Sequence, residues 1–261
     1  MARHPFYQID AFAGRAFAGN PAAVVCLDSW LPDSVMQAIA VENNLSETAF
    51  IVREAEGWRI RWFTTLAEID LCGHATLASA WVLFHELEPG TDRIVFQSQS
   101  GPLNVARAGE ALMLDLPSRP GRPAPDLRDR LEQGLGVRAS GVYRARDAMV
   151  VVEDEAAVRA VRPDLAALEG LPTLGVIVTA PGNACDFVSR CFFPGDAVPE
   201  DPVTGSAHCT LVPYWADRLQ KQRLRAFQAS ARGGELVCEL AGDRVRLGGR
   251  AVKVIEGWLT I

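Results

Sequence analysis

Glu47, His74 and Asp201 are the residues whose types and positions best suit the movement of a proton on a bound molecule. Glu47 precedes the apolar segment 49–52, a pattern typical of a strand covered on both faces. A carboxylate pushed towards such an apolar interior becomes a stronger base, as the removal of a proton from carbon requires. The structural alternative is that Glu47 is an ordinary turn residue.

His74 opens an expected helix directly after Gly73. A helix start disfavours the imidazolium ion, so a neutral, hydrogen-bonding histidine is expected there. A purely structural histidine is the alternative. Asp201 precedes a second helix start, where it either caps the loop or presents a carboxylate to an ammonium group of a substrate. Ser206 would add one hydroxyl beside Asp201 at this second helix start.

Both expected helices begin after a glycine, at Gly73 to Ala75 and at Gly205 to Ala207. The first backbone N–H groups of a helix have no partner within it and lie at the positive end of its dipole, so each start is a possible anion site. Two such starts could hold one substrate carboxylate. The sequence has neither a Gly-x-Gly-x-x-Gly pattern nor a P-loop lysine, so nucleotide binding is weakly supported.

Cys72 lies directly before Gly73. A helix start lowers the pKa of a thiol, and thiolate pairs move the proton in cofactor-independent racemases. A packed and inert thiol is the alternative interpretation. The sequence has no C-x-x-C pair, which argues against a zinc or thioredoxin-like site. The histidines show no ligand spacing with each other or with acidic residues, so we expect neither a metal nor an organic cofactor.

Composition narrows the classes of partner. Of the 261 residues, 49% are hydrophobic and 22% charged, and the formal net charge is -6. An acidic chain without a lysine or arginine cluster argues against nucleic acid and anionic membranes as partners. No stretch has the length of a signal peptide or a membrane span, so we expect a cytoplasmic protein with its six cysteines reduced.

The elements that must position these residues form two similar groups. The segments 74–88 and 206–219 are apolar all the way round, as in helices buried on every side. Arg61-Trp62-Phe63 precedes the first helix and Arg190-Cys191-Phe192 precedes the second. We interpret this as a degenerate two-fold repeat, in which each domain wraps a sheet around one central helix. Coincidence among common residues is the alternative.

A proline-rich segment gives the best domain boundary. Residues 117–125 contain four prolines and one glycine, which exclude a helix or a central strand. We therefore expect an N-terminal domain over 1–116, which a C-terminal strand at 252–261 could complete, and a C-terminal domain over 126–251. Most of the last forty residues have the pattern of β-strands separated by glycine-containing turns.

Five segments in the same order resemble the PhzF-like family of phenazine-biosynthesis proteins. They are NPAAVV at 20–25, LSETAF at 45–50, LCGHAT at 71–76, SRCF at 189–192 and EDPVTGSAH at 200–208. Each one is weakly specific, but together they cover most of the chain and are highly specific. The resemblance implies an α+β, diaminopimelate epimerase-like fold with two pseudo-symmetric domains, each a barrel-like mixed β-sheet around a central helix.

The resemblance also implies a cofactor-independent isomerase that acts between its domains on a small, amino-bearing carboxylic acid. The best-known family reaction isomerises trans-2,3-dihydro-3-hydroxyanthranilate, and a homodimer is implied. By motif, Glu47 matches the proton-shuttling glutamate of the family. His74, Asp201 and Ser206 match its polar substrate-binding residues.

Two departures keep alternatives open. The stretch after the proline-rich segment looks short for the family, so the substrate can differ from that of the phenazine enzyme. In related racemases the position of Cys72 carries one catalytic thiol, but the second is missing, since Pro202 to Gly205 stand where Cys-Gly-Thr-Gly would be. An amino-acid epimerase using Cys72 and Glu47, or a non-catalytic binding protein, are the rival hypotheses.

Overall fold

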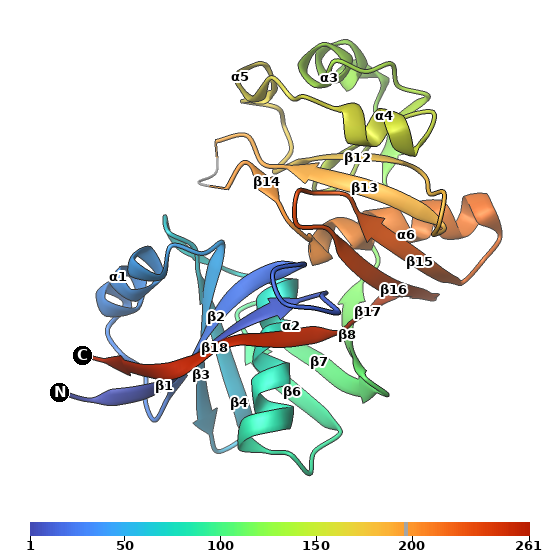
Figure 1. Cartoon of the computed structure of the whole chain (residues 1–261). Helices are drawn as coiled ribbons and strands as arrows, with labels where there is room; N and C mark the ends of the chain where they lie inside the picture. The colour runs from blue at the N-terminus through green and yellow to red at the C-terminus, as the bar shows by residue number, and fades with distance from the viewer. Residues whose placement is uncertain (196–197) are drawn as a thin grey trace. The chain divides into compact units, whose positions relative to one another are not determined.

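The structure is a computed structural model that describes residues 1–195 and 198–261. The chain divides into two compact units (Figure 1). Unit 1 comprises Met1–Asp115 and Gly248–Ile261, and unit 2 comprises Leu116–Leu247. Strands β8 and β17 carry the chain from one unit into the other.

Unit 1 is a mixed sheet with two main helices. Its strands are β1 (Arg3–Ala11), β2 (Asn20–Leu27), β3 (Glu47–Glu54), β4 (Gly57–Phe63), β5 (Glu68–Ile69), β6 (Arg93–Ser98), β7 (Gly101–Ala108), β8 (Ala111–Pro117) and β18 (Ala251–Thr260). Its helices are α1 (Asp33–Asn43), α2 (Gly73–Val82) and the π-helix η1 (Leu83–Leu87). The strands pair in the order β18, β1, β2, β3, β4, β6, β7, β8, with β5 beside the end of β4.

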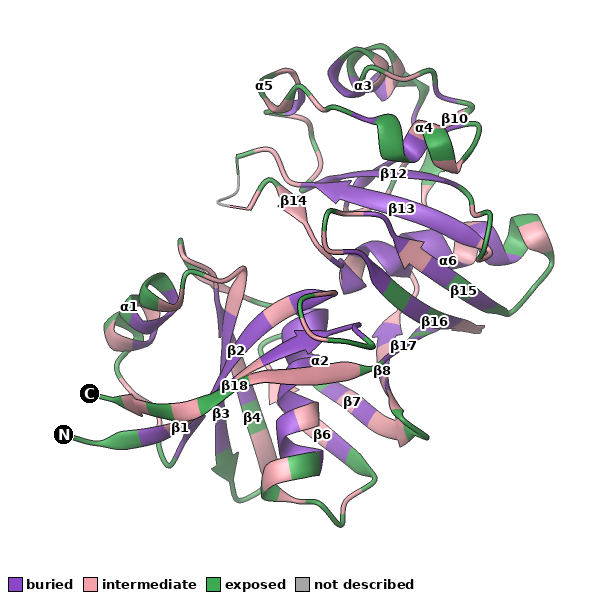
Figure 2. Cartoon of the chain, viewed as in Figure 1, coloured by how far each residue is buried: buried purple, intermediate pink, exposed green. Residues whose placement is uncertain are grey.

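The parallel pair β2 and β3 is apolar on both faces because a helix covers each side. Phe50 and Val52 of β3 pack on Met36 of α1 in one hydrophobic cluster. The other face lies against α2, which also contacts β1 and β18. Helix α2 is therefore buried along almost its whole length (Figure 2). This explains the lack of a polar face over its residues in the sequence.

The helical segment predicted over 74–88 changes type near its end. The α-helix stops at Val82, and the next turn is a π-helix in which the N–H of Glu88 donates to the carbonyl of Leu83 at 2.6 Å. The guanidinium of Arg107 donates to the carbonyl of Phe84 in the same turn. A side chain that takes up a helix carbonyl in this way favours the wider turn.

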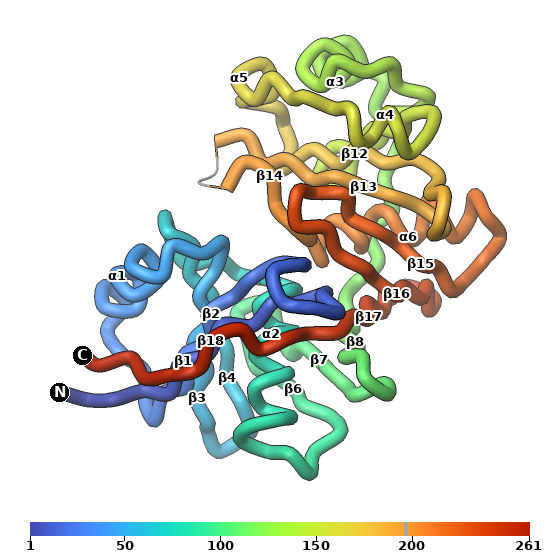
Figure 3. Tube along the Cα trace, in the orientation of Figure 1, coloured from blue at the N-terminus to red at the C-terminus, as the bar shows by residue number. Residues whose placement is uncertain are grey.

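The two ends of the chain lie side by side in unit 1 (Figure 3). Strand β18 runs antiparallel to β1, with Arg3 opposite Thr260. The N–H of Ala2 donates to the carbonyl of Ile261, and the N–H of Ile261 donates back to Ala2. The C-terminal strand thus completes the sheet that the N-terminal strand begins.

Unit 2 repeats the order and direction of the strands of unit 1. Its strands are β9 (Arg122–Pro123), β10 (Gly141–Arg144), β11 (Ala148–Val151), β12 (Val176–Pro181), β13 (Phe187–Phe192), β14 (Glu200–Asp201), β15 (Arg223–Gln228), β16 (Gly234–Ala241) and β17 (Arg244–Gly249). Its helices are the 3-10 helix η2 (Pro125–Leu127), α3 (Arg128–Leu135), α4 (Glu155–Ala160), α5 (Leu165–Leu168) and α6 (Gly205–Leu219). The pair β11–β12 is parallel like β2–β3, and β13–β15 is parallel like β4–β6.

The core of unit 2 also has two sides. Leu131 of α3, Val158 of α4 and Leu168 of α5 form one hydrophobic cluster with the strands β11 to β13. On the side of α6, the ring of Trp215 from this helix stacks on Phe187 of β13, with ring centroids 5.8 Å apart. Helix α6 is therefore the counterpart of α2.

The proline-rich segment is packed against unit 2. Strand β9 pairs with β10, with Arg122 opposite Arg144, and the N–H of Arg119 donates to the carbonyl of Cys209 at 2.8 Å. Prolines suit this two-residue edge strand because an edge leaves backbone N–H groups unpaired.

Among the described residues, none of the helices has both the length and the apolar composition that a membrane span requires.

Candidate active site

A largely buried cluster of polar side chains in unit 1 lies where β3 and α2 begin. Glu47 is the first residue of β3, and His74 lies in the first turn of α2. The Nε2 atom of His74 is 3.1 Å from Oε2 of Glu47. The side chain of His74 is 4% exposed and that of Glu47 is 16% exposed, so the pair is largely shielded from water.

Two further side chains contact the other ring nitrogen of His74. The amide Nδ2 of Asn20, at the start of β2, is 3.1 Å from Nδ1. The sulfur of Cys72 is 3.5 Å from the same nitrogen. Three neighbouring elements therefore fix the imidazole between an amide and thiol on one side and a carboxylate on the other.

The facing atoms of Glu47 and His74 remain without a well-aligned hydrogen bond. Among the described residues, neither Glu47 Oε2 nor His74 Nε2 has a partner with hydrogen-bond geometry, although the two atoms are close. Buried polar atoms in native proteins nearly always have a partner, and exceptions concentrate where a ligand or water completes the bonding. Catalytic hydrogen bonds are also often poorly aligned before substrate binds. The pair is therefore suited to bind and react with a ligand.

Burial sets the protonation of this cluster. Burial raises the pKa of Cys72, and the Glu47 carboxylate raises it further, so this residue is held as a thiol. Burial lowers the pKa of His74 and the Glu47 carboxylate raises it; because Cys72 is held as a neutral thiol, it adds no negative charge that would stabilise the imidazolium further. The helix start does not make a free thiolate here, because the loss of solvent costs more than the dipole supplies.

The first backbone N–H groups of α2 lie next to this pair along the chain. Cys72 precedes the helix in an extended conformation and makes no side-chain capping bond. The N–H of Ala75 interacts with the Cys72 sulfur, whereas Gly73 and His74 belong to the first turn of the helix, whose N–H groups have no partner within the helix.

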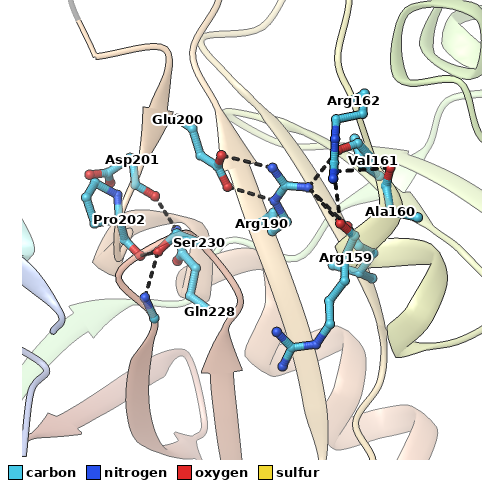
Figure 4. Close-up of polar contacts among 12 residues, drawn as sticks. Arg159, Ala160, Val161, Arg162, Arg190, Glu200, Asp201, Pro202, Gln228 and Ser230 are labelled. Atoms are coloured by element: carbon cyan, nitrogen blue, oxygen red, sulfur yellow. Dashed lines mark hydrogen bonds and ion pairs between the residues drawn. The ribbon is translucent and has the colours of Figure 1, made fainter.

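Asp201 belongs to a second group, in unit 2. Its carboxylate Oδ2 accepts a hydrogen bond of 2.6 Å from the hydroxyl of Thr204, which precedes α6. The Gln228 amide donates to the backbone carbonyl of Asp201 at 2.7 Å and accepts from the N–H of Thr204 at 2.8 Å. Ser230 donates to the carbonyl of Pro202 (Figure 4). The turn before Gly205, Ser206 and Ala207 is thus held by side chains from β15 and the residues that follow it.

Each group stands beside a paired arginine and glutamate. Arg190 binds both carboxylate oxygens of Glu200, at 2.7 and 2.9 Å, and also donates to the carbonyl of Val161 at 2.8 Å (Figure 4). Arg61 binds Glu68 in the same manner, at 2.7 and 2.6 Å. These bidentate pairs fix β14 and β5, the short strands that lead into the two helix starts.

Glu47, Cys72 and His74 have ligand atoms within 4.8 Å of one another, as a metal site would require. However, Cys72 faces Nδ1 of His74, whereas Glu47 faces Nε2. A single ion binds one ring nitrogen, and in this ring orientation the thiol and the carboxylate contact different nitrogens. All three residues could hold one ion only after the ring turns.

Comparison with known proteins shows the family to which the chain belongs. The family model for phenazine biosynthesis-like proteins matches residues 9–257. An uncharacterized isomerase of Pseudomonas aeruginosa is 56% identical over 254 residues, which cover 97% of either chain. The chain belongs to the phenazine biosynthesis-like family, and it is an isomerase.

Solved structures agree with this assignment. The crystal structure of a PhzF-family protein from Enterococcus faecalis has a TM-score of 0.96 and 48% identity, and the match covers both chains completely. A hydroxyproline epimerase from Agrobacterium vitis shares the fold alone, with a TM-score of 0.62 at 9% identity over 98% of this chain and 92% of its own. The expected epimerase-like α+β fold is confirmed.

The sequence prediction named most of this site but missed one contact. The structure brings Glu47, His74, Gly73 and Ala75 together in unit 1, and Asp201, Gly205, Ser206 and Ala207 together in unit 2. That both groups bind one ligand stays a prediction. Asn20 was part of the family-like segment 20–25, but no role was assigned to it. An asparagine between glycine and proline at a strand start was the available signal.

Proposed function

We propose that this protein is a cofactor-independent isomerase that moves a carbon-bound proton on a small, amino-bearing carboxylic acid. The observation that carries the proposal is the shielded pair of Glu47 and His74, whose facing atoms lie 3.1 Å apart without an aligned bond. A carboxylate beside a hydrogen-bonding imidazole is the arrangement that general acid–base chemistry at carbon needs.

In the proposed reaction Glu47 removes a proton from one carbon of the substrate and becomes a carboxylic acid. The electron pair of that C–H bond shifts into the adjacent unsaturated system. Glu47 then returns the same proton to another carbon, and the double bond moves. No oxidant, reductant or second substrate is needed, and the carboxylate ends as it began. His74 stabilises the negative charge of the Glu47 carboxylate before the substrate binds.

The groups at both helix starts complete the proposed binding site. Gly73 and His74 offer backbone N–H groups to the substrate carboxylate. The starts at Gly205, Ser206 and Ala207 would contact the same carboxylate, and Asp201 would bind an amine or hydroxyl. Support for this second group comes from its equivalent place in the repeat. A crystal grown in sulfate should show one anion within hydrogen-bonding distance of both starts, and separate anions or none would contradict this part.

The rival hypothesis is an amino-acid epimerase in which Cys72 and Glu47 act on opposite faces of one carbon. Its support is the position of Cys72 before the helix and the fold of the hydroxyproline epimerase. Burial holds Cys72 as a thiol, and its sulfur lies against Nδ1 of His74, away from the nitrogen that faces Glu47. Both observations favour the carboxylate mechanism.

The first substrate to test is trans-2,3-dihydro-3-hydroxyanthranilate, followed by a thermal-shift screen of small amino and carboxylic acids. Turnover in deuterated water distinguishes the mechanisms, because an epimerase exchanges the α-hydrogen without moving a double bond. Glu47→Gln keeps the size of the side chain but removes the base, so turnover should fall by about 100-fold or more. Circular dichroism and urea unfolding would show that the variant folds.

Cys72→Ser is the matched comparison at the same helix start. It should keep most of the activity if the carboxylate moves the proton. A loss equal to that of Glu47→Gln would favour the epimerase, and near-normal turnover of Glu47→Gln would refute the assignment of the base.

We also propose a cytoplasmic homodimer that does not bind nucleic acid. Support comes from the family resemblance and from the net charge of -6. Light scattering coupled to gel filtration measures the oligomeric state directly, and a monomer at micromolar concentration would contradict the proposal.

A further inference from the structure

Asn20 is a fully buried polar residue to which the proposed reaction assigns no part. Its side chain is enclosed at the start of β2, and its relative exposure is 0%. Its amide nitrogen Nδ2 is 3.1 Å from Nδ1 of His74, across 54 positions of sequence. Burying an amide costs free energy unless its hydrogen bonds are made, so the contact with His74 helps to stabilise the buried Asn20 side chain.

The chemistry of the contact decides where the imidazole carries its proton. An amide nitrogen can only donate a hydrogen bond, so Nδ1 of His74 must accept it. The thiol of Cys72, which burial keeps protonated, lies 3.5 Å from the same nitrogen, and its S–H is a second, weaker donor that suits an accepting Nδ1. With Nδ1 occupied as an acceptor, the proton of the neutral ring lies on Nε2, which faces Oε2 of Glu47.

We propose that Asn20 is a positioning residue that holds neutral His74 as the Nε2–H tautomer, so that the ring proton is on the nitrogen nearest the carboxylate of Glu47. The inference rests on the proposed role of Glu47. In this tautomer the imidazole stabilises an ionised carboxylate, the form that can accept a proton from carbon. In the other tautomer a lone pair on Nε2 would face Glu47 and would favour its protonated form, which is no base.

The chain before Asn20 is built to hold the amide in place. Gly19 has a φ of +64°, and a Cβ there would lie 2.1 Å from the carbonyl oxygen of Ala11. Phe17 also has a positive φ of 69°, and its N–H donates to the buried carboxylate of Asp10 at 2.7 Å. Unfavourable backbone conformations persist where the surroundings enforce them, and they are enriched at functional sites. Here they fix the residue next to the imidazole.

The direct test is nitrogen NMR of the intact protein labelled with ¹⁵N-histidine, with the His74 signals assigned through a His74→Gln variant. At a pH where the same ¹⁵N shifts show the His74 ring to be neutral, Nε2 should carry the proton and Nδ1 should be unprotonated. A dominant Nδ1–H tautomer in the wild-type protein would overturn the inference without any variant.

Variants of Asn20 test whether the amide is the cause. Asn20→Ala should give a mixture of tautomers, and Asn20→Asp should favour Nδ1–H, because a carboxylate accepts a hydrogen bond and does not donate one. A wild-type tautomer in both variants would overturn the inference. Turnover should fall about 10-fold to 100-fold in each, in line with the cost of a misplaced catalytic group.

Ser79→Ala is the matched control. Ser79 is buried in the same helix, and its hydroxyl donates to the carbonyl of Ala75 at 2.8 Å rather than to His74. It should keep both the Nε2–H tautomer and the turnover; loss of the tautomer would show that any damage to α2 shifts the ring. The two proposals can fail separately. If the wild-type protein shows the Nε2–H tautomer but Glu47→Gln remains active, the assignment of Glu47 as the base is refuted and the inference about Asn20 stands.

Discussion

The two units share the order and direction of their strands but carry different side chains at their helix starts. In unit 1, Phe63 of β4 lies opposite Thr48 and Glu68, and in unit 2, Phe192 of β13 lies opposite Val176 and Glu200. The strand register aligns Glu47 with Gly175, and matching the first residues of α2 and α6 aligns the residues at the two helix starts. The corresponding pairs are Glu47 with Gly175, Cys72 with Thr204, Gly73 with Gly205, His74 with Ser206, and Ala75 with Ala207.

The comparison separates what the repeat conserves from what each unit adds. Both units keep a glycine at the helix start and the bidentate arginine–glutamate pair before it. Only unit 1 has, at these paired positions, a carboxylate and an imidazole that can exchange a proton. Unit 2 has Gly175 and Ser206 there, together with Asp201 on β14. We therefore expect proton transfer to depend on unit 1 and substrate anchoring on unit 2.

The largest expected difference between the units concerns stability. Arg190 has an 11% exposed side chain and binds both Glu200 and the carbonyl of Val161. Removing one partner of a buried pair leaves the other uncompensated, so Arg190→Met should lower the free energy of unfolding by about 3 kcal/mol. Arg61→Met should cost less, since its side chain is 18% exposed and one of its partners, Asp33, is 75% exposed. Urea titration measures both.

The double variant Arg190→Met/Glu200→Gln is the control for this comparison. It should recover part of the loss, because no buried charge remains unpaired. An equal cost at Arg61 and Arg190 would show that burial does not distinguish the two pairs.

The next effect is a pH dependence of stability that arises from a buried histidine of unit 2. His208 is fully buried, and its Nδ1–H donates to the carbonyl of Thr204 at 2.8 Å; burial lowers its pKa to about 4. Because the unfolded chain binds this proton from about pH 6.5 and the folded chain does not, stability falls between about pH 6.5 and pH 4, by about 3 kcal/mol in all. Its counterpart in unit 1, Thr76, does not titrate.

His208→Asn should remove most of that slope, since an asparagine amide can make the same bond without titrating. Urea unfolding at several pH values, with Thr76→Ser as the control, measures it. A slope that survives the substitution would assign the acid sensitivity to other groups.

A smaller effect is expected at the buried carboxylate of unit 2. Asp147 precedes β11, and burial raises its pKa despite Arg146, 3.6 Å away. The ionised carboxylate is therefore disfavoured in the folded protein, so its stability cost is present at neutral pH and disappears as the pH falls. Asp147→Asn should raise the melting temperature slightly at neutral pH and have less effect in acid. It should leave turnover nearly unchanged, and a loss like that of Glu47→Gln would place catalytic chemistry in both units.

The smallest expected effect is that of chelators. Glu47 and Cys72 face opposite nitrogens of His74, so the cluster does not present three ligands to one ion. Activity should be unchanged after treatment with EDTA or phenanthroline. Stoichiometric zinc that leaves together with activity would refute this and would show that the ring turns to bind it.

The sequence predicted the strands and helices well where burial is extreme. The apolar segments of β3 and the two central helices were recognisable because a fully covered element has no polar face. The helices α3, α4 and α5 were not located individually, since short amphipathic helices in an alanine- and charge-rich segment have weak signals. The π-helix at the end of α2 was not predicted either, because its cause is Arg107, more than twenty positions away.

By itself the sequence determined the family, the repeat of arginine, phenylalanine and glycine, and the candidate base Glu47, because these are properties of residue type and order. Only the tertiary structure decided how the candidates act on one another. It placed Asn20 and Cys72 on one nitrogen of His74 and Glu47 on the other, which burial alone would not predict. The reason is physical: hydrogen bonds depend on distances of a few tenths of an ångström between residues far apart in sequence, and packing sets those distances.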